Sequence, residues 1–191
     1  LKSTGGVANQ FGYAWDRGVN EPDLSQFNER KRILFASSCA MLIKKDLFDA
    51  TGGFDNDLFY MGEDYDLGLR LYIKGEEILY VPQAVCFHAD QAQDKENLLK
   101  KKYYIERNRL VILLKNYEIG YLAKLFIPLL FLKCLKYFLY VVRFKGHRLK
   151  YAGDVISGWA WILRHLGAIA QKRAVVDASR QRRICDIFSD F

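Results

Sequence analysis

Proline and glycine are scarce in this sequence, at 3 and 14 of 191 residues. Apolar residues make up 51 % of the chain and charged residues 27 %. Disordered, collagen-like and low-complexity chains have the opposite bias, so these classes are excluded. The length fits one compact domain, or a domain with an appendage, and suffices to bury a sizeable core.

Closely spaced cysteines are also missing. The four cysteines, Cys39, Cys86, Cys134 and Cys185, are about 50 residues apart and form no CxxC pair. Neither a zinc-ligand spacing nor a disulfide framework is indicated. We therefore expect reduced structural thiols in a cytosolic protein.

No uncharged run is long enough to cross a membrane. The most apolar segment, residues 121–144, has its longest uncharged stretch at 125–132 and is interrupted by Lys124, Lys133, Lys136 and Arg143, whereas a span needs roughly 20 apolar residues. Three of these cations fall on one arc of a helix, which predicts a helix lying on a membrane surface with basic groups toward lipid phosphates. Residues 151–170, which contain Trp159, form a second such segment. A helical hairpin packed on protein and a re-entrant span are the alternatives.

Charge is divided unevenly along the chain. Residues 1–94 carry a net charge of −6 and residues 95–191 a net charge of +13. This asymmetry predicts a chemical site in the front half and contact with an anionic surface in the back half. The aromatic residues of the basic half are grouped with apolar residues and are not interleaved with the charges. A stacking groove needs that interleaving, so we expect no nucleic-acid partner.

Strand and helix patterns alternate in the front half. Hydrophobic periodicity and the positions of glycine and proline predict buried strands over 33–43 and 77–87, the second interrupted by Pro82 and continuing to a strand end at His88. The same signals predict helices over 44–50, closed by Gly52-Gly53, over 63–74, closed by Gly75, and over 96–117. This order is typical of an α/β fold.

Five carboxylates lie within twelve residues: Asp55, Asp57, Glu63, Asp64 and Asp66. Acidic residues are common in the first turn of a helix, where they meet the positive end of its dipole, so a purely local role is one reading. The other reading starts from the apolar residues 58–61 between them, which would desolvate a carboxylate and raise its pKa toward that of a general base. Asp64 and Asp66 also form a D-x-D pair that could hold Mg²⁺ or Mn²⁺. Residues two apart on a helix point about 200° away from each other, so only one of the pair can face a site.

Three further residues are candidates for binding roles. His88, predicted at a strand end, is either a structural histidine or a metal ligand or acid/base group. Arg107 and Arg109 are either surface charges or a clamp for a diphosphate, which arginine forks suit.

Several motifs occur in a familiar order: a small-residue strand running into MLIKKDLF, then GGFD, EDYDLGLRL and YVPQAVCFH, followed by YYIERNRLVILLKNY. Over about residues 1–118 this order resembles the second half of the inverting family-two glycosyltransferases of the GT-A fold, especially rhamnosyltransferase-like members. Ser38 stands where such enzymes commonly have glycine. The family's nucleotide-binding first half has no counterpart here, and the chain starts at Leu1. We therefore expect a processed product, a cut domain or a fragment.

The resemblance implies roles for individual residues. Asp64 matches the general base that deprotonates the acceptor hydroxyl, and Glu63 would support or orient it. His88 matches a histidine that often joins the metal, Mg²⁺ or Mn²⁺, and Arg107 would reach the donor diphosphate. The acceptor pocket would be shaped by Gly53, Phe54 and Asp55.

The resulting fold expectation is the acceptor-side half of an α/β GT-A domain over 1–118, followed by a basic amphipathic helical tail over 119–191. The expected function is inverting transfer of a sugar, hexosyl or rhamnosyl, from a nucleotide-diphosphate donor to a lipid-linked or polysaccharide acceptor. The expected location is cytoplasmic, peripheral on the inner face of the cell membrane. The alternative is an inactive fragment or binding module that docks on a membrane or a partner protein.

Overall fold

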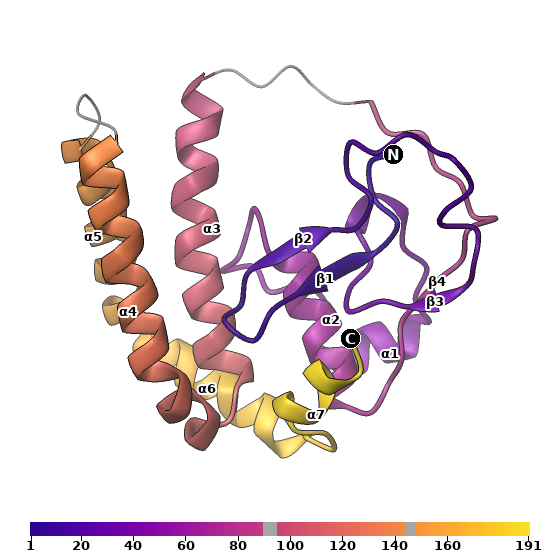
Figure 1. Cartoon of the computed structure of the whole chain (residues 1–191). Helices are drawn as coiled ribbons and strands as arrows, with labels where there is room; N and C mark the ends of the chain where they lie inside the picture. The colour runs from indigo at the N-terminus through magenta and orange to yellow at the C-terminus, as the bar shows by residue number, and fades with distance from the viewer. Residues whose placement is uncertain (90–94, 144–147) are drawn as a thin grey trace.

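The structure, a computed structural model, describes residues 1–89, 95–143 and 148–191 (Figure 1). The strands are β1 (Gly6–Ala8), β2 (Ala14–Asp16), β3 (Lys31–Arg32) and β4 (Leu79–Tyr80). The helices are the 3₁₀ turn η1 (Ser38–Ala40), α1 (Lys45–Thr51), α2 (Glu63–Ile73), α3 (Lys95–Asn116), α4 (Ile119–Arg143), α5 (Arg148–Arg164), α6 (Leu166–Ala178) and α7 (Ile184–Ser189). Helix dominates this mixed α/β arrangement.

The strands form two small antiparallel pairs, β1–β2 and β3–β4. The chain beyond β3 joins the two pairs, because the Leu34 N–H donates to Gly6 and the Gly6 N–H donates to Phe35. The predicted strand over 33–43 is therefore only partly correct. Ile33, Leu34 and Phe35 are buried, but the small residues that follow turn into η1, and Leu42 is fully exposed.

The second predicted strand is shorter than expected. Only β4 forms, and a turn follows at Pro82, which has no N–H to donate to a sheet. Residues 84–88 are exposed and form no strand. The prediction that His88 ends a strand is therefore wrong.

The predicted helices of the front half are confirmed to within a residue or two at each end as α1 and α2. Gly52 ends α1 in the left-handed conformation, with its N–H donating to Asp49. Gly68 of α2 packs directly on the strand segment, where a Cβ would lie 2.5 Å from the Leu34 carbonyl oxygen. The glycine of the EDYDLGLRL motif therefore permits the close contact between α2 and the strands.

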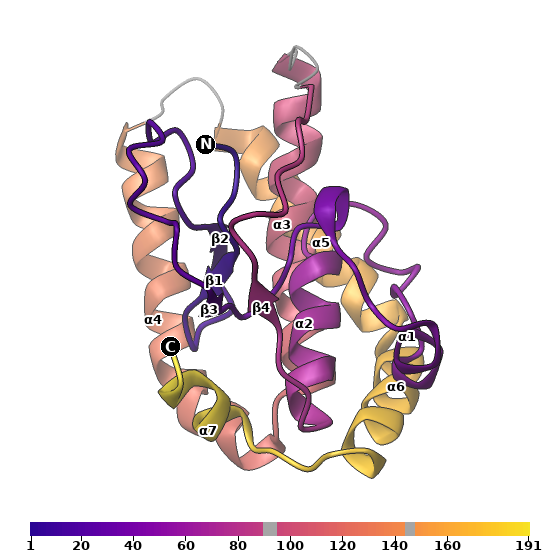
Figure 2. The same cartoon turned by 90° about the vertical axis from the view of Figure 1, so that its right-hand side faces the viewer.

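Helix α3 is central to the packing. It contacts α2, α5 and α6 (Figure 1), and Figure 2 shows the strands between α4 on one side of the view and α2 on the other. The core joins front and back halves, since Ile112 of α3, Tyr72 of α2 and Ile184 of α7 belong to one buried cluster. The helices after residue 118 thus pack on the same core as the residues before it.

Helix α4 is apolar on two faces. Leu125 lies in the core, and Tyr121, Leu122 and Leu129 pack against it. Beyond Ile119, which is also exposed, the other face exposes five large apolar side chains by 40 % or more: Phe126, Ile127, Leu130, Phe131 and Leu135. We call these five residues the α4 apolar face. Among the described residues, no helix has the length and hydropathy needed to cross a membrane.

All four cysteines are free thiols, as expected, but all four are exposed. None of the four side chains therefore belongs to the buried core.

Candidate active site

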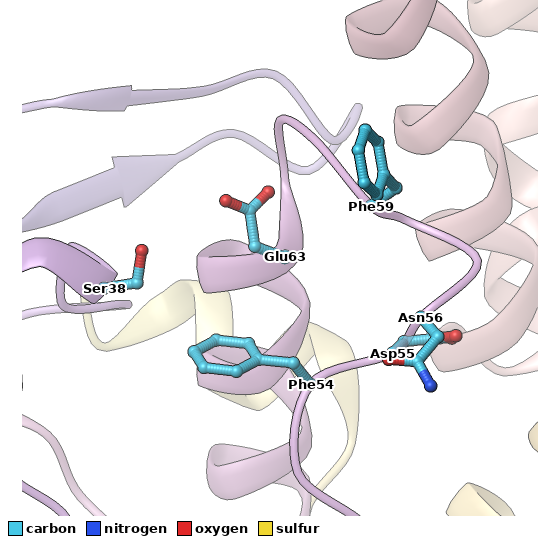
Figure 3. A pocket seen from close by; sticks show the side chains of 6 residues that line it. All are labelled: Ser38, Phe54, Asp55, Asn56, Phe59 and Glu63. Carbon is cyan, nitrogen blue, oxygen red and sulfur yellow. The ribbon is translucent and has the colours of Figure 1, made fainter.

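An open pocket of about 480 Å³ lies at the amino-terminal end of α2. Its lining comes from η1, from α2 and from the loop between α1 and α2: Ser38, Phe54, Asp55, Asn56, Phe59 and Glu63. Figure 3 shows the Phe54 ring beneath the Glu63 carboxylate, with Ser38 on one side, Asp55 and Asn56 on the other, and Phe59 at the far edge. Two aromatic rings therefore share the pocket with carboxylate, hydroxyl and amide groups.

Glu63 and Asp64 begin α2 and are both half-buried. Burial raises the pKa of Glu63, and the neighbouring charge of Asp64 raises it further. Burial also raises the pKa of Asp64, and the negative charge of Asp16 on β2 adds to it, while hydrogen bonds from the backbone and side chain of Ser38 oppose the shift. Both carboxyls therefore gain proton affinity, as a general base requires.

In each of these carboxyl groups, one oxygen accepts no hydrogen bond from the described residues. Oε2 of Glu63 and Oδ1 of Asp64 are buried and have no hydrogen-bond partner in the described part of the chain. Unpaired buried oxygens are costly, so each needs an explanation, of which a catalytic role is one. Glu63 lines the pocket, and Asp64 adjoins it through Ser38.

Asp66 has a different environment, as helix geometry predicts for the second member of the D-x-D pair. Its side chain is fully buried and accepts from Arg70 at 2.9 Å and from Asn116 at 2.8 Å. The Lys115 ammonium lies 2.8 Å from its Oδ1. All its strong partners are protein groups, so Asp66 joins α2 to α3 and does not face the pocket.

Asp55, predicted to shape the acceptor pocket, is held by two cations. Lys115 of α3 lies 2.5 Å from its Oδ2, and Lys172 of α6 pairs with its Oδ1. Lys172 also lies 2.6 Å from Asp57. Burial raises the pKa of Asp55, but the charge and hydrogen bond of Lys115, together with the hydrogen bond from Lys172, outweigh it and lower the pKa to about 2. Asp55 therefore fixes the pocket wall to the C-terminal helices.

The lowered pKa makes this contact sensitive to acid. The stability that ionised Asp55 contributes is present above its ordinary pKa of 3.8 and is lost as the pH falls toward about 2. We expect Asp55→Asn to be less stable at neutral pH and to lose less stability than the wild type between pH 3.8 and about 2. Urea unfolding at a series of pH values measures this, with Asp49→Asn as the control because its pair with Lys45 is exposed. An unchanged pH dependence in Asp55→Asn would contradict the assignment.

The other predicted acceptor residues lie beside the pocket in different ways. Phe54 lines it, with its ring in edge contact with Phe48 at 5.6 Å. Gly53 lies behind it and is buried, with a left-handed φ of 61° and a carbonyl that accepts from Arg70 at 2.6 Å. Gly53 therefore shapes the turn that presents Phe54.

Arg107, predicted to reach a donor diphosphate, is buried at 6 % exposure. Its guanidinium donates to the Asp57 carbonyl at 2.6 Å and lies 4.4 Å from the centre of the Trp161 ring on α5. Arg109 is buried as well and donates to the Phe11 carbonyl at 2.8 Å. In this structure both guanidinium groups support loops around the site.

The loop 58–61, between the pocket wall and α2, is strained. Phe59 and Met61 have positive φ values of 40° and 69°, which cost non-glycine residues on the order of 1–3 kcal/mol each. The buried Asn108 of α3 holds the loop, because its amide nitrogen lies 2.7–2.8 Å from the carbonyls of Leu58, Tyr60 and Met61. This arrangement keeps Phe59 at the pocket although its side chain is 80 % exposed.

Several residues around the site escaped the sequence analysis. Asp16, Asn56 and Asn108 come from separate parts of the chain, and no local pattern distinguishes them. Phe59 was seen only as part of an apolar segment, and Ser38 only as a departure from the family pattern. The contact between Ser38 and Asp64 depends on the fold and has no sequence signal.

The described residues contain no group of three histidine, cysteine, aspartate or glutamate side chains able to hold a metal ion. His88 is exposed in the segment after β4. One histidine does not by itself supply the several oxygen ligands that Mg²⁺ prefers. The Mg²⁺ or Mn²⁺ site and the metal role of His88 therefore stay predictions.

Two half-buried carboxyls with raised pKa values thus lie at an open, partly aromatic pocket or against its lining. A sequence model described as "Glycosyltransferase like family 2" matches residues 2–111. The chain belongs to this family, which confirms the resemblance of its motifs.

One similar curated protein is the O-antigen biosynthesis protein RfbC of Myxococcus xanthus. It is 27 % identical over 71 residues, which are 37 % of this chain and 6 % of that protein. The chain thus matches only a small part of that relative's length. No solved structure matches significantly.

Proposed function

We propose that this chain forms the acceptor side of an inverting glycosyltransferase, with Asp64 as the general base. The donor would be a nucleotide-diphosphate sugar, hexosyl or rhamnosyl, and the acceptor a lipid-linked or polysaccharide glycan. The observation that carries the proposal is the half-buried Asp64 carboxyl, with its raised pKa and an unpaired buried oxygen, beside the pocket. Family membership and the similarity to an O-antigen biosynthesis protein support it.

In the proposed reaction, the acceptor hydroxyl lies in the pocket and its oxygen attacks the anomeric carbon of the donor sugar. The bond from that carbon to the diphosphate oxygen breaks, and the nucleoside diphosphate leaves with the electron pair. Asp64 takes the hydroxyl proton, for which its raised proton affinity suits it. Glu63 supports Asp64 and, from the pocket wall, also contacts the acceptor, and Ser38 fixes the Asp64 carboxyl.

The direct test is release of nucleoside diphosphate from a panel of nucleotide sugars by the polypeptide that carries residues 1–191. We expect release that depends on an added glycan or lipid-linked glycan acceptor. Release that is independent of every acceptor would indicate plain hydrolysis and would contradict the proposal.

We further propose that the protein lies on the cytoplasmic face of the cell membrane, where it would meet lipid-linked acceptors. The α4 apolar face supports this, because exposed apolar patches of this kind mark membrane or protein contacts. The net charge of +13 over 95–191 suits an anionic leaflet.

Two substitutions on the α4 apolar face test membrane binding. We expect Ile127→Asp/Phe131→Asp to lose sedimentation with phosphatidylglycerol vesicles, because both side chains are more than 60 % exposed and aspartate is repelled by apolar and anionic surfaces alike. Gln171→Asp/Ala174→Asp on α6, at exposed positions, is the charge-matched control and should still sediment. Equal sedimentation of both variants would contradict the assignment of α4.

A binding module without catalysis is the competing function. The exposed α4 apolar face is equally suited to a partner protein. The substitution of Asp64 treated in the Discussion separates the two functions.

A further inference from the structure

The loop 58–61 combines three features that together fix an exposed aromatic ring at the pocket. It contains a large aromatic ring, Phe59, at 80 % exposure. Its backbone is strained at Phe59 and Met61. One buried amide, that of Asn108, donates to three of its carbonyls. Burial of the ring therefore does not explain why this backbone strain is retained at Phe59.

The ring is also fixed from behind. Tyr104 of α3 lies 6.2 Å from Phe59 and 6.0 Å from Tyr60, centre to centre. Arg107 in turn lies 5.0 Å from the centre of the Tyr104 ring. The Phe59 ring is therefore supported by Tyr104, and Tyr104 in turn by the buried Arg107, both on α3.

The pocket beside this ring has a mixed chemistry. Phe59 and Phe54, the latter 36 % exposed, are its aromatic lining. Ser38, Asn56 and Glu63 supply hydroxyl, amide and carboxylate groups at the same pocket. A hydrocarbon chain would leave these polar groups unpaired, whereas a sugar presents hydroxyls at its edge and C–H groups on its faces.

We propose that Phe59 is a stacking platform for a pyranose ring of the acceptor glycan. The C–H face of the sugar lies on the negative face of the aromatic ring, and the hydroxyl groups reach Asn56 and Glu63. The proposal rests on the proposed function, since it places the acceptor next to the carboxylates that start α2. It goes further in naming the acceptor end as a sugar ring and Phe59 as the residue that binds it.

Because the backbone of Phe59 has a positive φ, substitutions at this position can separate the role of the ring from the cost of the backbone conformation. Phe59→Gly removes the ring and relieves the positive φ, so it should melt at a higher temperature than Phe59→Ala. Phe59→Trp keeps a stacking ring at the same backbone position. Phe87→Ala is the control, because Phe87 is 95 % exposed and does not line the pocket.

Binding is measured without donor or turnover by saturation-transfer NMR, with methyl pyranosides as probes and dihexanoylphosphatidylcholine as a lipid probe. We expect saturation of the sugar C–H protons in the wild type, Phe59→Trp and Phe87→Ala, and loss of it in Phe59→Gly. In the transfer assay, Phe59→Gly should raise the acceptor KM about tenfold with little change in kcat. Sugar signals that persist in Phe59→Gly, or Phe59-dependent signals from the lipid alone, would overturn the proposal.

These outcomes are separable from failure of the proposed function. Transfer that depends on Asp64 but not on Phe59 would keep the glycosyltransferase assignment and reject the platform. Sugar binding that depends on Phe59 without any transfer would keep the platform and reject the enzyme.

Discussion

Asp64→Asn should lower the rate of sugar transfer by about 10²- to 10⁴-fold, the usual contribution of a general base. The substitution keeps the shape of the side chain and the contact with Ser38 but removes the carboxylate oxygen that accepts the proton.

Because burial raises the pKa of Asp64, its charged form is less favourable in the folded than in the unfolded chain. Stability therefore falls as the pH rises from the ordinary pKa of 3.8 to the raised folded value, and Asp64→Asn should escape this loss. Initial rates and melting temperature at neutral pH measure both effects.

Glu63→Gln is the matched control, because Glu63 is adjacent in α2 and also has a raised pKa and an unpaired buried oxygen. We expect it mainly to raise the acceptor KM. Loss of kcat in Glu63→Gln, with Asp64→Asn active, would transfer the role of base to Glu63. Unchanged turnover in both variants would support a binding module instead.

Asp66→Ala should destabilise the fold by about 3–5 kcal/mol, a large part of the stability of an ordinary domain. Asp66 is fully buried, and the substitution leaves Arg70 and Lys115 without the carboxylate they share. Asn116 loses its acceptor as well. Chemical denaturation at neutral pH measures the change in unfolding free energy.

The double variant Asp66→Ala/Lys115→Met tests whether charge is the cause. Removing one cation together with the anion should cost less than the sum of the two single substitutions, because fewer buried charges are left unpaired. Asp49→Ala, which breaks an exposed pair with Lys45, should change stability by about 1 kcal/mol or less. If the loss of unfolding free energy in the double variant equals the sum of the losses in the two single variants, the proposed coupling between Asp66 and Lys115 is contradicted.

Local signals in the sequence predicted the helices well and the strands poorly. Helix α2 has apolar spacing and a terminal glycine, both local, and it forms where predicted. The run 33–43 is apolar enough for a strand, but among the described residues it has no β partner beyond Phe35, and partners are set by tertiary structure. The prediction for the segment to His88 failed for the same reason, since no strand in the described part of the chain pairs with it after β4.

The candidate site was predictable where its residues are neighbours in sequence. Phe54 and Glu63 lie near each other along the chain and line the pocket, and Asp64, next to Glu63, is hydrogen-bonded to the lining residue Ser38. The contribution of the distant helices was not predictable, because Lys172 reaches Asp55 across 117 residues and Asn108 reaches Leu58 across 50. Lys172, in the segment 119–191 expected to form a basic amphipathic helical tail, thus helps to hold the pocket wall.

The anomeric configuration of the transferred sugar tests the central claim most directly. Proton NMR of the product formed by the polypeptide that carries residues 1–191 gives this configuration from the anomeric coupling or chemical shift. A single displacement assisted by Asp64 predicts a configuration opposite to that of the donor, with the signal absent for Asp64→Asn. A retained configuration, or full product formation by Asp64→Asn, would contradict the account.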